Sequence, residues 1–188
     1  MNFKRDVLIT ATIILGLIRS VDLNAQDGNT DNHTIGITIP EVALVDIEPA
    51  ASRNISMNFT APTEAGNPII APNNNSTLWI NVSSIKSTGD PTRTVSVKLT
   101  ALIPGVAIKV TAAADAGQGA GTMGTPSSQL TLSTSDQGIV TGIGSAYTGN
   151  GASKGYNLTY NVSSPDGNYG NLSANAAIAT VTYTISDN

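Results

Sequence analysis

Alternation of apolar and polar residues with a period of two recurs along this chain, and helical periodicity does not. Because successive side chains of a strand point to opposite faces, this pattern predicts strands that are buried on one side. The alternating apolar residues are Ile55, Met57 and Phe59; Leu78, Ile80 and Val82; Val95, Val97 and Leu99; and Val106, Ile108 and Val110. Further strands are predicted at residues 128–133, 138–143, 155–162 and 177–186, the last with Val181, Tyr183 and Ile185 on its apolar face. Stretches rich in Gly, Pro, Asn and Asp separate these segments, including a long loop from Ala112 to Ser128, so the pattern predicts an all-β, two-sheet sandwich.

Composition narrows the classes of function. The chain has no cysteine, which excludes a disulfide framework and thiol catalysis. Only 12% of the residues are charged, so we expect a polar but weakly ionic surface. After the first 25 residues the basic side chains are few and scattered along the sequence, which argues against nucleic acid or an anionic membrane surface as a partner.

The N-terminus has the pattern of a secretory signal peptide. Lys4 and Arg5 precede an uncharged apolar run from Val7 to Ile18, and small or polar residues follow as far as Ala25. The apolar run is shorter than the roughly 20 residues that a spanning helix needs. We therefore predict export, a signal peptide over residues 1–25, and no membrane span after cleavage.

Residues 33–48, HTIGITIPEVALVDIE, form a strand-like apolar segment behind this signal. If the segment is extended, Ile35, Ile37 and Ile39 (the isoleucine triplet) share one face, and Ala43, Val45 and Ile47 continue the alternation. Such a face must be buried. It either packs into its own domain as an ordinary first strand or completes the sheet of a neighbouring molecule by strand addition.

No set of residues predicts catalysis, a cofactor or a metal site. His33, the only histidine, is expected to be an exposed side chain beside the isoleucine triplet. Asp46 and Glu48, at strand spacing, could bind a cation or act as acid and base, but we expect them to lie on a solvated strand face or to protect a strand edge. The residues Pro165, Asp166 and Gly167 predict a turn, because the surrounding sequence lacks the ligand spacing of a calcium loop.

Trp79 is the only tryptophan, and it falls on the face opposite Leu78, Ile80 and Val82. It is therefore either an exposed platform for a ligand such as a glycan, or a side chain covered by a second layer or by another subunit. We favour the covered position, because no other aromatic residue lies near it in the sequence.

The segment ITIPEVALVDIE, placed ahead of an all-β region without cysteines, resembles the N-terminal extension of chaperone-usher pilins. The similarity is closest to the alternate-chaperone (alpha) class and to spore-coat-U-like domains. The ending AIATVTYTISDN also resembles the final strand of such pilins, although Tyr183 lies further from the terminus than the tyrosine of the common pilin ending, and Glu41 interrupts the alternation of the first segment.

This resemblance implies a single immunoglobulin-like β-sandwich with an N-terminal donor-strand-like extension. The implied layout is a signal peptide (1–25), an extension and first strand (26–48) and a sandwich domain (49–188). The implied function is that of a structural subunit of a cell-surface fimbria, exported through the periplasm, whose partners are copies of itself or related subunits, a periplasmic chaperone and an outer-membrane usher. The alternative is a secreted sandwich that binds a glycan or a surface partner as a self-contained domain.

Overall fold

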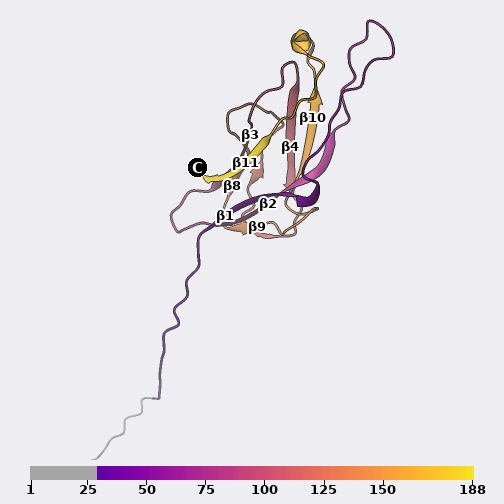
Figure 1. Cartoon of the computed structure of the whole chain (residues 1–188). Helices are drawn as coiled ribbons and strands as arrows, with labels where there is room; N and C mark the ends of the chain where they lie inside the picture. Colours follow the sequence, from indigo (N-terminus) through magenta and orange to yellow (C-terminus); the bar gives the residue numbers. More distant parts are fainter. Residues whose placement is uncertain (1–28) are drawn as a thin grey trace, which may run out of the picture. The chain divides into compact units, whose positions relative to one another are not determined.

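The computed structural model describes residues 29–188, so the predicted signal peptide lies outside the described residues. These residues fall into two units, one ending at Thr38 and one spanning Ile39–Asn188, which we call the compact unit (Figure 1). Residues 30–40 contain no strand, and the first strand starts at Val42. The strand predicted from His33 therefore exists only in its second half.

The compact unit is almost entirely β. Its elements are β1 (Val42–Glu48), η1 (Ala50–Ser52), β2 (Asn75–Ile85), β3 (Arg93–Leu99), β4 (Ala107–Asp115), β5 (Ala120–Gly121), β6 (Thr125–Pro126), β7 (Leu130–Thr131), β8 (Gln137–Ile143), β9 (Ala146–Tyr147), β10 (Tyr156–Ser163), η2 (Asp166–Asn171) and β11 (Val181–Asp187). Within residues 29–188, the strands form a seven-stranded and a four-stranded sheet in which every pair is antiparallel.

One apolar core lies between the two sheets. The predicted inward-facing residues of β2 (Leu78, Ile80 and Val82) and of β3 (Val95, Val97 and Leu99) are all buried in it. In β10 every second side chain is buried, from Tyr156 to Val162. This confirms the all-β class and the two antiparallel sheets predicted from the alternation.

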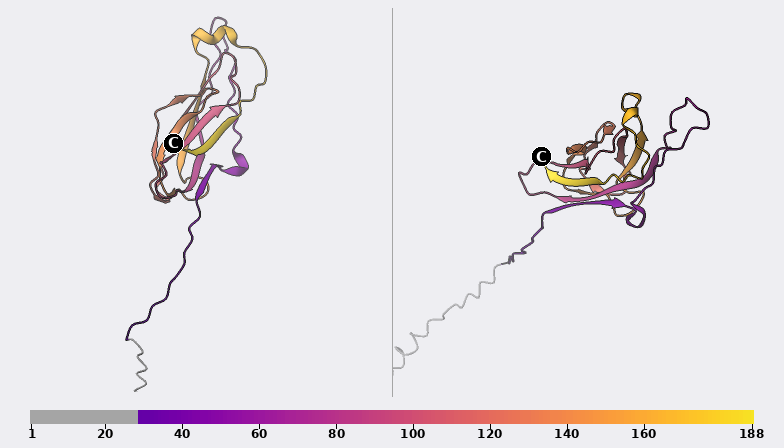
Figure 2. Two further views of the ribbon diagram at one scale, coloured as in Figure 1. Left: turned by 90° about the vertical axis from the view of Figure 1, so that its left-hand side faces the viewer. Right: turned by 45° about the horizontal axis from the view of Figure 1, so that its top comes forward.

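β1 is an outer strand of the larger sheet. Ile80 of β2 is paired with Ile47 of β1 and also with Tyr156 of β10, so β2 lies between β1 and β10. In the smaller sheet the order is β11-β3-β8-β6, and β11 is the outer strand beside β3 (Figure 2). β1 and β11 also approach each other, which brings one outer strand of each sheet to the same side of the compact unit.

Two predictions from the sequence are wrong in detail. The segment Arg53–Phe59 shows the predicted alternation, with Ile55, Met57 and Phe59 half-buried, but it pairs with no strand of the described residues. The predicted loop from Ala112 to Ser128 is shorter than expected, because β4 continues to Asp115 and β5 and β6 occupy part of the remainder. Each of these strands has only two residues, one of which is Gly121 in β5 and Pro126 in β6, so neither shows an alternating pattern.

Candidate functional site

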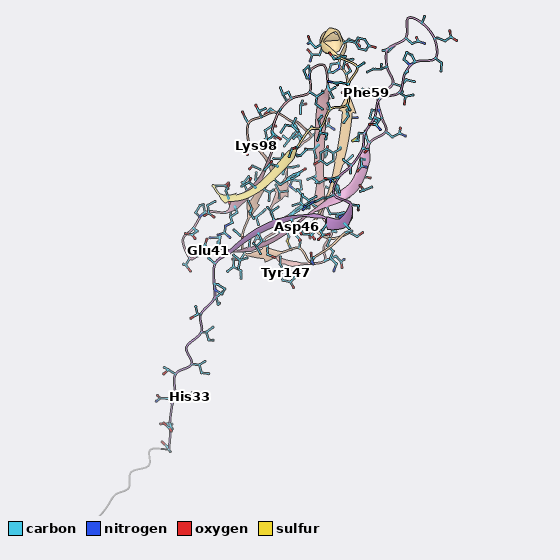
Figure 3. The ribbon with its side chains drawn as sticks, in the orientation of Figure 1. His33, Glu41, Asp46, Phe59, Lys98 and Tyr147 are labelled. Carbon is cyan, nitrogen blue, oxygen red and sulfur yellow. The ribbon has the colours of Figure 1, made fainter. Side chains whose placement is uncertain are left out.

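A large groove with many apolar side chains runs along the side of the compact unit where β1 and β11 approach. Its volume is about 1460 Å³. Residues of β1, the unpaired segment 53–59, the loop before β4, β10 and the chain leading into β11 line it (Figure 3 labels Asp46 on β1 and Phe59). Its apolar lining includes Val45, Ile47, Ile55, Met57, Leu102, Ile108, Val162, Ile178 and Val181.

Part of this lining is open to solvent. Ile178 is 94% exposed and Leu102 is 60% exposed, and both lie in irregular segments at the groove. Residues 173–178 form a continuous exposed stretch that precedes β11. Apolar side chains gathered in a groove and left in water are typical of an interaction surface.

The edge of β11 that faces away from β3 has free backbone groups. The Thr100 N–H donates to the Thr180 carbonyl oxygen at 3.0 Å, and Asn188 N–H donates to the Thr92 oxygen at 3.3 Å, in line with the β3–β11 register. Because hydrogen-bonding direction alternates along a strand, Val181, Tyr183 and Ile185 direct their backbone groups away from β3. No backbone hydrogen bond joins this edge to another element of residues 29–188.

The outer edge of β1 can be derived in the same way. Val82 of β2 bonds Thr148 through both its N–H and its carbonyl oxygen, at 3.0 and 3.1 Å, on the side away from β1. Val82 is opposite Val45, so Val45 and its alternate neighbour Ile47 direct their backbone groups away from β2. The groove is thus flanked by one free edge from each sheet.

A buried arginine lies where β1 and β11 approach. The Arg93 side chain is 2% exposed, and its Nε donates to Asp187 Oδ1 at 2.8 Å. The same guanidinium also donates to the Glu41 carboxylate, just before β1, and to the Val42 carbonyl oxygen at the start of β1. In β2 it donates to Ser84 Oγ and to the Ile85 carbonyl oxygen, both at 3.3 Å. The hydrogen bond to Asp187 and the two carboxylates outweigh desolvation and raise the pKa of Arg93, so the group is a permanent cation. Val42 and Ile185 do not line the groove, which therefore ends before this cluster.

Two tyrosines that line the groove connect the sheets. The hydroxyls of Tyr160 in β10 and Tyr183 in β11 are 2.6 Å apart. Burial raises the pKa of Tyr160, and burial together with the neighbouring Tyr160 raises that of Tyr183, so both hydroxyls stay protonated at neutral pH.

The structure separates the predicted N-terminal residues into two groups. Ile35, Ile37 and Ile39 are 75%, 80% and 71% exposed, and none of them belongs to a strand. Ala43, Val45 and Ile47 lie in β1, hydrogen-bonded to β2 of their own chain, and Val45 and Ile47 pack against the core. Among these six residues, the isoleucine triplet is therefore the group without a partner in its own chain.

The predicted C-terminal residues Val181, Tyr183 and Ile185 lie in β11 and pack against the core. Trp79 is half-buried on β2, opposite Glu48. The aromatic side chain beside a second, smaller hollow of about 350 Å³ is Tyr147, which is 56% exposed (Figure 3). Nothing in the sequence around Tyr147 marks it as a candidate, because the two-residue strand β9 shows no alternation.

The remaining polar candidates make local contacts. Asp46 Oδ1 accepts the Ile47 N–H at 2.8 Å, and Glu48 Oε2 accepts the Ala50 N–H at 2.8 Å. His33 is exposed, and Asp166 begins the short helix η2 rather than a simple turn. In the part of the chain that the structure describes, no group of three His, Cys, Asp or Glu side chains is arranged to hold a metal ion. Across the same residues, no helix has the length and apolar character to span a membrane.

Comparison of the chain with protein-family models, with curated proteins and with solved structures finds no match. The groove, its two free strand edges and the exposed isoleucine triplet are therefore the observations from which function must be argued.

Proposed function

We propose that this protein is a structural subunit of a cell-surface fibre, in which the isoleucine triplet of one molecule adds as a strand in the groove of the next. The observation that carries the proposal is the groove itself, which combines apolar lining with a free strand edge from each sheet. A strand-shaped apolar segment satisfies both features at once, because its side chains fill the groove while its backbone pairs with an edge.

The isoleucine triplet has the matching chemistry. Its side chains are 71–80% exposed, and they occur at the alternating spacing that directs all three to one face of an extended chain. Burying an isoleucine side chain contributes roughly 1.5 to 3 kcal/mol, so three contribute on the order of 5 to 9 kcal/mol before ordering costs. Backbone hydrogen bonds to a sheet edge add to this.

A contact of this kind is head-to-tail, since the segment and the groove are different surfaces of the same chain. Such contacts produce open filaments unless the rotation between neighbours closes a ring. We accordingly propose that the compact unit is an immunoglobulin-like sandwich that lacks one strand, and that the fibre is exported through the periplasm with the help of a chaperone and an outer-membrane usher. Three observations support this proposal: the two antiparallel sheets, the apolar run Val7–Ile18 and the pilin-like ends of the chain.

Deletion of residues 27–40 tests the proposal. The deletion variant retains the groove and loses the isoleucine triplet, so we expect it to stay monomeric with an empty groove and to be stabilised when a peptide of residues 33–41 is supplied. Thermal melts with and without the peptide provide the measurement, and the same peptide with Ile37→Asp is the matched control. A deletion variant that the peptide does not stabilise would instead favour a self-contained binding domain.

A further inference from the structure

The groove offers two sheet edges to an incoming strand, one from β1 and one from β11. We infer that Asp46 blocks the β1 edge and thereby assigns the incoming segment to β11. This inference rests on the proposed function and adds to it a residue that selects between two pairing partners.

A strand that pairs with β1 needs the backbone groups of Val45 and Ile47, which are the outward-directed residues of β1 at the groove. In an antiparallel ladder, hydrogen-bonded pairs recur every second residue, so these two residues supply consecutive rungs. If either is unavailable, the ladder along this part of β1 is interrupted.

Asp46 makes one of these two rungs unavailable. Its Oδ1 accepts the Ile47 N–H at 2.8 Å, and Asp46 itself lines the groove. An incoming strand would have to displace this carboxylate and would bring its own carbonyl oxygen toward a negative charge. Charged side chains placed at an outer strand are a general means of preventing unwanted pairing.

The β11 edge has no equivalent protection. Val181 and Tyr183 both line the groove and direct their backbone groups outward, and no described side chain bonds those groups. Residue 182 between them is a threonine, which carries no charge. The comparison of the two edges therefore favours β11.

Amide hydrogen exchange followed by NMR tests the assignment. The acceptor is the full mature chain carrying Ile37→Asp, and the probe is a peptide of residues 33–41. We expect the peptide to slow exchange at Val181 and Tyr183 by roughly tenfold or more, and to leave Val45 and Ile47 unchanged.

Two substitutions isolate the side chain. In Asp46→Ala, peptide addition should also slow exchange at Val45 and Ile47, because the β1 edge becomes available. Asp46→Asn, whose amide oxygen can still accept the Ile47 N–H although the charge is gone, should slow exchange at Val45 and Ile47 less than Asp46→Ala does. If Asp46→Ala leaves the exchange pattern unchanged, or if Asp46→Asn behaves like Asp46→Ala, the blocking role of the Asp46 hydrogen bond is wrong.

The experiment distinguishes failure of the β11 assignment from failure of the proposed fibre function. Binding of the peptide with slowed exchange at Ile47 rather than at Tyr183 in the parent would overturn the assignment alone. Absence of peptide binding would overturn the proposed function, and the assignment with it.

Discussion

The hydroxyl oxygens of Tyr160 and Tyr183 lie 2.6 Å apart and form a direct hydrogen bond between the two sheets. Tyr160 belongs to β10 in the larger sheet, and Tyr183 belongs to β11 at the outer edge of the smaller one. Because both rings line the groove, this bond holds β11 at a fixed separation from the larger sheet. The width of the groove beside β11 therefore depends on these two side chains.

Tyr183→Phe removes one hydroxyl and leaves that of Tyr160 without its partner in buried surroundings. We expect a loss of about 1 to 3 kcal/mol in the free energy of unfolding, and a similar loss for Tyr160→Phe. The double variant should lose less than the sum of the two, because it leaves no buried hydroxyl unpaired. Urea denaturation of the four chains, each carrying Ile37→Asp to keep the molecules apart, measures this. Strictly additive losses would contradict the hydrogen bond.

The same tyrosines predict sensitivity to alkali. Burial raises the pKa values of Tyr160 and Tyr183 above 10.0, the value of an unperturbed tyrosine, so in the unfolded chain these hydroxyls ionise first. A folded-state pKa above the unfolded one gives stability that is complete below pH 10 and is lost as the pH rises above it. The urea midpoint should therefore be level between pH 7 and about pH 9 and fall above about pH 10. The fall should be shallower in the Tyr160→Phe, Tyr183→Phe double variant, and an equally steep fall there would contradict this explanation.

Arg93→Met tests the cluster that joins β1, β2 and β11. It removes the hydrogen bonds that the guanidinium donates to the Val42 and Ile85 carbonyl oxygens and to the buried Ser84 Oγ, while Glu41 and Asp187 stay hydrated because they are about half exposed. We expect a loss of about 2 to 4 kcal/mol in the free energy of unfolding. Arg93→Lys should lose less because it keeps the positive charge, but it should still lose stability because an ammonium group cannot bond in several directions like a guanidinium.

Lys98→Met is the matched control for Arg93→Met. It breaks the exposed ion pair between Lys98 Nζ and Asp136 Oδ2, which are 2.9 Å apart, and should cost less than about 1 kcal/mol. Chemical denaturation of the variants gives the comparison. Equal losses for Arg93→Met and Lys98→Met would show that the Arg93 cluster does not hold the strands together.

Alternation in the sequence predicted where strands form but not how each one pairs. β2, β3 and β10 match their predicted ranges closely, because one of their faces is buried and the side-chain period is then visible. Segment 53–59 has the same period and stays unpaired, since alternation reports burial of side chains and carries no information on backbone partners.

Of the candidate site, the sequence predicts the isoleucine triplet but not the groove. The triplet lies within one short stretch of sequence, and its spacing alone makes it a candidate. The groove is assembled from β1, segment 53–59, the loop before β4, β10 and the chain before β11, so no local pattern could indicate it. Leu102 and Ile178 lie in irregular segments, and Arg93 begins a strand without any signal that it is buried.

The substitution Ile37→Asp tests the central claim most directly. Ile37 is the middle residue of the isoleucine triplet, and a carboxylate in an apolar groove would be strongly disfavoured. We predict that the mature variant is as stable as the parent compact unit, forms no fibres, and shortens wild-type fibres when the two are mixed, as seen by electron microscopy. If the triplet instead folds back into its own chain, the variant should lose several kcal/mol in its free energy of unfolding, and fibre length should not change. Normal fibres together with normal stability would contradict the account, because the triplet would then have no partner in either position.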